Sequence, residues 1–147
     1  MYMGEIPPHV AESAGWIRGV VAQLHRRLRH VDNAGILTPS QSAVLHRLHR
    51  EGPATQGELA AAEHVRQQSM AATLGVLDEL GYLDRTPDPA DRRRVVISLS
   101  GAGRDTVRGI QQHRDEWLAQ ALLDELSPAE LDAVTRALPL LQRVAEH

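Results

Sequence analysis

The stretch DRTPDPADRRRVVISLS, residues 84–100, has the composition of a β-hairpin with a stiff and charged tip. Pro87 and Pro89 cannot donate hydrogen bonds to a strand ladder, so residues 87–91 are predicted to form the turn. Residues 82–86 and residues 92–99 are predicted as the strands on either side, and the second carries alternating apolar side chains. The sequence therefore predicts one hairpin in this region.

Helices are predicted on both sides of the hairpin, because apolar residues recur there with the helical period of 3.6 residues. They span about residues 9–31, 39–50, 56–63, 67–80, 101–123 and 128–146. Gly81 is predicted to end the fourth. Three of the helices begin with capping-box patterns, which are Thr38-Pro39-Ser40-Gln41, Thr55-Gln56-Gly57-Glu58 and Ser127-Pro128-Ala129-Glu130.

The order of these elements predicts a mainly α fold with one β-hairpin. Residues 38–99 form a winged helix-turn-helix pattern, in which two helices joined by a tight turn are followed by the hairpin. The flanking segments, residues 1–37 and 100–147, carry apolar stripes that so small a lobe cannot cover. A second copy of the chain would cover them, so the N- and C-terminal helices are predicted to form the dimerisation region of a homodimer.

The composition of the 147 residues excludes several classes of function. The chain has no cysteine, which removes disulfides, thiolate metal sites and cysteine nucleophiles. No apolar run approaches the length of a membrane span and no export signal is visible, so a cytoplasmic protein without membrane contact is expected. The net charge is −3, but residues 115–147 alone hold seven acidic residues against two arginines. A polyanion would therefore be bound elsewhere, by a local cluster of arginines.

The chain resembles the MarR family of bacterial transcriptional regulators over nearly its whole length. The matching segments are Leu37–Gln41, Gly57–Ala60, Leu77–Leu83 and, as the most specific, Asp84–Arg94 followed by Val95–Ser100. The resemblance implies a homodimer that binds double-stranded DNA and has a cleft for a small-molecule effector between the dimer helices and the DNA-binding lobe. It implies a regulator, expected here to be a repressor on a pseudo-palindromic operator, with no cofactor.

DNA contacts are predicted from the second helix of the helix-turn-helix, from the wing and from Gln56. The beginning of the second helix of the helix-turn-helix should enter the major groove with Arg66, Gln67, Gln68, Ser69 and Ala72. The family often has an arginine where Ala72 stands, so its base preference does not carry over. Gln56, at the start of the preceding helix, is predicted to contact a phosphate.

The wing is the second predicted contact. Neighbouring side chains on a strand point to opposite faces, so Arg92, Arg93 and Arg94 are not expected to act alike. One should reach the minor groove or a phosphate, and another should pair with Asp88 or Asp91, which would shape the tip. The plain alternative is a solvated tip with surface ion pairs, and the preceding helix-turn-helix favours DNA contact.

The remaining residues offer candidates for an effector cleft and for a metal site. Aromatic and histidine side chains on the dimer-side helices would suit an amphipathic aromatic acid, and the candidates are Trp16, Leu24, His25, His113 and Trp117. His46 and His49 have the spacing of two metal ligands on one helix, but no third ligand is evident. Solvated or core histidines are favoured, and no metal site is predicted.

Two other classes of protein remain as alternatives. Gly101-Ala102-Gly103 imitates the start of a dinucleotide-binding fingerprint, but Thr106 stands where the third glycine belongs and no βαβ unit is predicted. The chain is therefore not expected to be an enzyme. An interaction protein that kept this fold and lost DNA binding is the other alternative, and the salt dependence of binding to DNA distinguishes the two.

Overall fold

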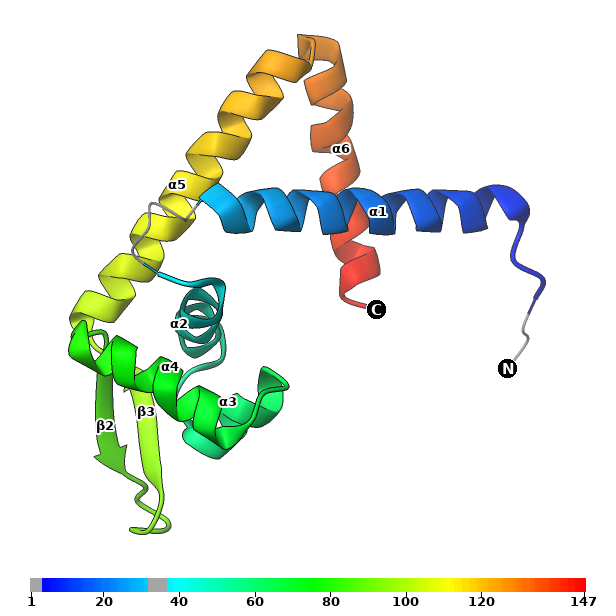
Figure 1. Ribbon diagram of the computed structural model, residues 1–147. Helices are drawn as coiled ribbons and strands as arrows, with labels where there is room; N and C mark the ends of the chain where they lie inside the picture. Colours follow the sequence, from blue (N-terminus) through cyan, green and yellow to red (C-terminus); the bar gives the residue numbers. More distant parts are fainter. Residues whose placement is uncertain (1–3, 32–36) are drawn as a thin grey trace.

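The computed structural model describes residues 4–31 and 37–147 of the chain. The lobe made by the central elements lies at one end, and α1, α5 and α6 extend away from it (Figure 1). Helix α5 leaves the lobe as a long rod, and α6 folds back from its far end. The elements in chain order are α1 (Pro8–Val31), α2 (Pro39–Glu51), β1 (Ala54–Thr55), α3 (Gln56–Ala62), α4 (Gln67–Glu79), β2 (Leu83–Pro87), β3 (Val95–Leu99), α5 (Gly101–Glu125) and α6 (Pro128–Ala145).

Two of the three predicted capping boxes are complete. The Thr38 hydroxyl accepts from the Gln41 backbone N–H at 3.2 Å, and the Gln41 side chain accepts from the Thr38 N–H at 3.0 Å. Ser127 and Glu130 make the same pair of hydrogen bonds at the start of α6. Each box satisfies N–H groups that have no partner inside the helix, and this is why α2 and α6 begin at these residues.

Gly81 ends α4 as predicted. Its φ of 76° lies in the left-handed region, which glycine reaches without a clash of a Cβ atom. The Gly81 N–H donates to the Asp78 carbonyl at 2.9 Å and the Tyr82 N–H donates to the Leu77 carbonyl at 3.0 Å. This is the hydrogen-bond pattern of a Schellman motif, and it turns the chain sharply from α4 into β2.

The sheet differs from the predicted hairpin in having a third strand. Its order is β1-β3-β2, all antiparallel, and Ala54 and Thr55 of β1 pair with Ile97 and Val96. Pro87 was predicted to lie in the turn but belongs to β2, opposite Val95. A proline is tolerated there because β2 is an edge strand. Strand β3 begins at Val95, so the three wing arginines lie in the turn and not on the strand.

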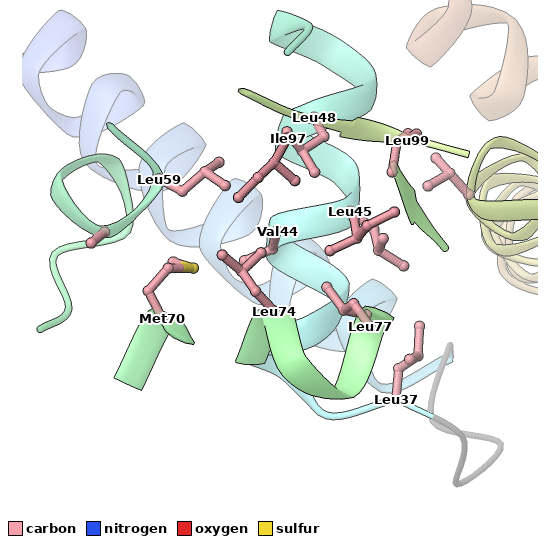
Figure 2. Close-up of a cluster of buried hydrophobic side chains, with 13 residues drawn as sticks. Leu37, Val44, Leu45, Leu48, Leu59, Met70, Leu74, Leu77, Ile97 and Leu99 are labelled. Carbon is pink, nitrogen blue, oxygen red and sulfur yellow. The ribbon is translucent and has the colours of Figure 1, made fainter. Parts of the chain in front are cut away.

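The core of the molecule lies within the lobe. Leu45 of α2 and Leu74 and Leu77 of α4 have no exposed surface, and Ile97 of β3 packs against the same cluster (Figure 2). Val107 brings α5 into this cluster. Helix α2 is therefore covered by α4, the sheet and the start of α5, which makes it the centre of the lobe.

A joint of four residues attaches α5 to the lobe. Ser100 caps α5 by accepting from the Gly103 N–H at 3.1 Å, and its hydroxyl donates to the Gly81 carbonyl at 2.6 Å. The Ser100 N–H donates to the Tyr82 carbonyl at 2.9 Å. A Cβ atom on Gly103 would lie 2.2 Å from that same carbonyl oxygen. The glycine thus allows α5 to pack closely against the turn between α4 and β2.

Helices α1 and α6 bury no residue within the chain, as far as the described residues go. Their apolar side chains remain exposed, for example Val21 at 58% and Leu138 at 54%. None of the described helices is both long and apolar enough to cross a membrane. The two helices therefore carry stripes for which the chain alone supplies no cover.

Two glycines of α5 provide a matched test of the joint. Gly103→Ala should destabilise the fold by about 1–3 kcal/mol, because its Cβ atom would overlap the Tyr82 carbonyl, a backbone atom that cannot move aside cheaply. Gly109→Ala adds a Cβ atom where nothing lies within 4 Å, and should stabilise the helix by about 0.5–1 kcal/mol. Urea unfolding of both variants checks this, and equal effects would contradict the close contact at Gly103.

Candidate nucleic-acid interface

The turn between α3 and α4 sets the direction of α4. His64 has a φ of 55°, and the Val65 N–H reaches back to the Ala60 carbonyl at 3.0 Å. Arg66 is the N-cap residue, but no side-chain hydrogen bond caps the helix. The free amides of the first turn of α4 are accompanied by no acidic side chain. This helix start therefore favours an anion.

All five residues predicted to contact DNA from this helix are exposed. They lie in its first two turns, with Met70, Leu74 and Leu77 on the buried side of the same helix. Arg66 and Gln68 form no hydrogen bond or ion pair with another described side chain. The exposed set is Arg66, Gln67, Gln68, Ser69 and Ala72.

Gln56 is bonded within the lobe. Its side-chain amide donates to the Gln67 carbonyl at 3.3 Å and to the Gln67 side-chain oxygen at 3.4 Å. The pair joins the start of α3 to the start of α4 and holds the Gln67 side chain beside Gly57. Of the two glutamines on α4, Gln68 is the one that this contact leaves unrestrained.

Asp88 and Asp91 both bond to the backbone of the wing. The Asp88 carboxylate accepts from the Ala90 N–H at 2.9 Å, and the Asp91 carboxylate accepts from the Arg93 N–H at 3.0 Å. The Asp88 N–H also donates to the Arg94 carbonyl at 2.8 Å. These short-range bonds give the tip a defined shape beyond the last pair of the β-ladder.

The three wing arginines differ in their partners. Arg94 donates to the Glu58 carboxylate at 2.6 Å and lies 3.9 Å from the Asp88 carboxylate. Arg92 and Arg93 are exposed and pair with no acidic group among the described residues. Since Arg92 to Arg94 lie in a turn, the alternation of faces expected for a strand does not apply to them. The positive charge at the tip is that of Arg92 and Arg93.

A separate cavity of about 670 Å³ lies between α1, α2 and α5. Of the five residues predicted for an effector cleft, only His25 lines it. Trp16 is 78% exposed near the free end of α1, and Trp117 lies under the guanidinium of Arg27 at 5.7 Å. Leu24 and His113 face solvent, although each is the sequence neighbour of a residue that lines the cavity.

The cavity is lined by histidines that the sequence analysis named and by arginines that it did not. Its polar wall is formed by His25, Arg29, His46, Arg47, His49, Arg50, Glu63, Gln111 and Arg114. Arg47 pairs with Glu63 at 2.6 Å, and the hydrogen bonds that it donates to Glu63 and then to Glu51 raise the pKa of Arg47. The sequence spacing could have indicated this basic wall, because His25 and Arg29 share one helix face, and so do His46, His49 and Arg50.

His46 is the most perturbed of these groups. Burial, followed by the positive charges of Arg114, His49 and Arg50, lowers the pKa of His46 from 6.5 to about 4. Its Nε2 atom is buried and has no hydrogen-bond partner in the described part of the chain. Three side chains able to hold a metal ion come together nowhere among the described residues. The wall is neutral at His46 and positive at its arginines, which suits an anion.

Comparison with known proteins agrees with this architecture. The MarR family pattern matches residues 37–94. An uncharacterized HTH-type transcriptional regulator of Mycobacterium bovis is 36% identical over 121 residues, which cover 82% of this chain and 84% of that protein. The crystal structure of a transcriptional regulator from Pseudomonas aeruginosa is 34% identical, with a TM-score of 0.82 over 96% of this chain and 98% of its own.

The structure of a MarR family protein from Bacillus stearothermophilus is similar as well. It is 25% identical with a TM-score of 0.71, and the match covers 99% of this chain and all of that one. These likenesses include α1, α5 and α6 as well as the winged lobe. The family match, the relatives and the shared fold agree, and the chain belongs to the MarR family of winged helix-turn-helix DNA-binding transcriptional regulators.

Proposed function

We propose that the chain is a cytoplasmic, homodimeric repressor that binds a pseudo-palindromic operator in double-stranded DNA. A small organic anion releases the protein from the operator. The observation that carries the proposal is the common location of its two DNA-facing parts. The exposed start of α4 and the wing tip lie at the end of the molecule opposite α6 (Figure 1). Footprinting on the region upstream of its own gene tests the proposal directly.

Base recognition is assigned to the start of α4. Arg66 can bridge O6 and N7 of guanine, and Gln68 can bridge N6 and N7 of adenine. Ser69 suits a phosphate or a base edge, and Ala72 is small enough to contact a thymine methyl group. Gln67 joins this set while bonded to Gln56, so its amide is already oriented when DNA arrives. Gln56 then acts through Gln67, with its own phosphate contact remaining a weaker alternative.

Backbone and minor-groove contact is assigned to the wing. Arg92 and Arg93 lie on a tip that Asp88 and Asp91 shape, and their guanidinium groups form no ion pair with a carboxylate among the described residues. A guanidinium suits the narrow minor groove of A·T-rich DNA, where the potential is most negative. The overall charge of −3 does not oppose this, because the contact depends on local charge.

Dimerisation is assigned to residues 1–37 and 100–147, and DNA binding to residues 38–99. Helices α1 and α6 present uncovered apolar side chains, and an apolar groove along α1 is lined by Ile17 and Val21 of α1 and by Val144 of α6. A two-fold axis would place the same stripes of two chains against each other and remove this surface from water. It would also present two copies of α4 to successive turns of a duplex.

The effector site is assigned to the basic cavity. Its volume of about 670 Å³ is that of a small-molecule pocket, and Glu63, the acidic side chain that lines it among the described residues, is paired with Arg47. Helix α2 has His46 and Arg50 on the cavity side and Val44, Leu45 and Leu48 in the core of the lobe. A ligand that fits one placement of α2 relative to α1 and α5 would shift the population of lobe positions and so the affinity for DNA.

The two kinds of DNA contact predict different losses. Arg93→Ala should weaken binding to every sequence and flatten the plot of log affinity against log salt by about one unit per wing. Gln68→Ala should leave that slope unchanged and relax the base preference at one position of each half-site, by about 1–3 kcal/mol of discrimination. Fluorescence anisotropy against the operator and its single-base variants measures both.

A matched control is available on α5. Arg108 is an exposed arginine, 3.7 Å from Asp105, and lies outside both predicted contacts. Arg108→Ala removes the same charge and should change neither affinity nor salt slope appreciably. If Arg93→Ala behaves like Arg108→Ala, the wing is not a DNA contact.

The dimer is tested on α6. Leu138→Glu should convert the protein to monomers at micromolar concentration, since it would bury two unpaired carboxylates across the two-fold axis. Arg143→Glu is the control on the opposite side of the same helix; it changes the charge by more and should leave the dimer intact. Sedimentation velocity reports the mass. A wild-type protein that sediments as a monomer would contradict the dimer.

The effector site predicts a preference for carboxylates and an uptake of protons. Benzoate should bind and weaken the DNA complex, whereas benzamide, of the same size and neutral, should not. A bound anion raises the pKa of His46 from about 4 toward its ordinary 6.5, so between these values the complex holds more protons than the free protein. Benzoate affinity should therefore increase as the pH falls from 6.5 toward about 5, a range in which the benzoate carboxylate stays ionised.

The proton uptake has its own pair of variants. His46→Gln should reduce the pH dependence of benzoate binding, while His113→Gln, an exposed histidine on α5 that does not line the cavity, should preserve it. Isothermal titration calorimetry in buffers of different ionisation enthalpy counts the protons. Equal binding of benzoate and benzamide would remove the argument that the arginines select the ligand.

A further inference from the structure

The wing is tied to α3 by an ion pair between residues 36 positions apart. The Arg94 Nη2 atom donates to the Glu58 Oε1 atom at 2.6 Å, and the Arg94 Nε atom lies 3.9 Å from the Asp88 Oδ2 atom. Arg94 is the last residue of the wing turn before β3, and Glu58 stands in the first turn of α3. The contact therefore bridges the wing and the helix-turn-helix directly.

The Glu58 carboxylate is available because the third predicted capping box is only half made. The Thr55 hydroxyl accepts from the Glu58 N–H at 3.2 Å, but no hydrogen bond from the Thr55 N–H to the Glu58 side chain is found among the described residues. Thr55 also belongs to β1 and pairs with Val96 of β3. In α2 and α6 the corresponding Gln41 and Glu130 side chains turn back to their caps, whereas Glu58 turns to the wing.

Arg94 is for this reason a poor candidate for a phosphate contact. Two carboxylates already face its guanidinium, so a phosphate would have to displace them or bind beside their negative charge. Arg92 and Arg93 have no such neighbours among the described residues. The sequence placed Arg94 with the DNA contacts, and its observed partners assign it differently.

We propose that Arg94 and Glu58 form a latch, and that Arg94 is a positioning residue that holds the wing at a fixed angle to α3 and α4. The proposal rests on the proposed DNA binding. With the latch closed, Arg92 and Arg93 are carried at a defined distance from the start of α4. With the latch open, residues 88–94 are attached to the lobe by the β-ladder alone. Binding to DNA must then also order the wing, which lowers the affinity.

The size of the effect follows from the exposure of the pair. The side chains of Arg94 and Glu58 are 50% and 55% exposed, and such ion pairs change an equilibrium constant by at most about five-fold. Arg94→Gln and Glu58→Gln should each weaken operator binding about two- to five-fold. The loss in Glu58→Gln would occur although that variant removes a negative charge from the DNA side of the protein.

A double-mutant cycle on the full-length protein decides between a latch and a DNA contact. For a latch, Arg94→Gln should cost less than 1.5-fold in affinity when Glu58 is already Gln, and the salt slope should stay at the wild-type value. For a contact, Glu58→Gln frees Arg94, so Arg94→Gln should cost as much or more in that background and flatten the slope by about one unit per wing. The second pair of results would overturn the proposal.

A measurement without DNA separates failure of the latch from failure of the proposed function. Amide hydrogen exchange at residues 88–94 should become faster in Arg94→Gln and in Glu58→Gln, and stay unchanged in the control variant Arg93→Gln. Unchanged exchange in the two latch variants overturns the latch whatever the DNA result. Faster exchange in a protein that binds no operator would keep the latch and refute the regulator function instead. Thermal unfolding confirms that each variant is folded.

Discussion

The joint at Ser100 is the contact on which the arrangement of the molecule depends. Ser100 bonds to the carbonyls of Gly81 and Tyr82 and caps α5 at the same time, while Gly103 lets α5 approach the Tyr82 carbonyl. The end of α4, the end of β3 and the start of α5 are thereby fixed at one point. Ser100 alone separates the end of β3 from the start of α5, so the joint contains no flexible linker.

The sixteen arginines differ in whether a carboxylate lies within ion-pair distance of the guanidinium. Arg85 is held by Asp78 at 2.7 Å and fastens β2 to α4, and Arg47 is held by Glu51 and Glu63 at the edge of the cavity. The guanidinium groups of Arg92 and Arg93 have no ion-pair partner among the described residues. Near a protein surface a charge acts over about 10 Å, so a negative overall charge is compatible with a positive tip and a positive cavity.

Helix α2 lies between the basic cavity, which we propose as the effector site, and α4, which we propose for base recognition. Its buried side packs against α4 and β3, and its other side forms the wall of the basic cavity beside α1 and α5. The buried side chains of α2 and α4 belong to one cluster, so the two helices form one packed body. Occupation of the cavity and the position of α4 are thus connected through a single helix. The latch at Glu58 would extend the same body to the wing, since α3 also packs on α4.

Interactions between near neighbours were determined by the sequence itself. The caps at Thr38 and Ser127, the glycine end of α4 and the alternating strand of the wing depend on residues within four or five positions of each other. The apolar periodicity likewise identified the core residues of α2 and α4 and the uncovered stripes of α1 and α6. These features are local, and the spacing of residue types is enough to specify them.

The tertiary structure alone decided which distant groups meet. Glu58 completes a capping pattern in the sequence, yet its carboxylate bonds to Arg94, and Ala54 and Thr55 add a strand that no pattern announced. His46, Arg29 and Arg114 come from three helices and share one cavity, whereas Trp16 and Trp117, which looked suited to it, lie elsewhere. The physical reason is that such contacts depend on how whole helices pack and on how each is rotated about its axis. A side chain such as Glu58, which has two possible hydrogen-bond partners, bonds to the partner that this packing brings within reach.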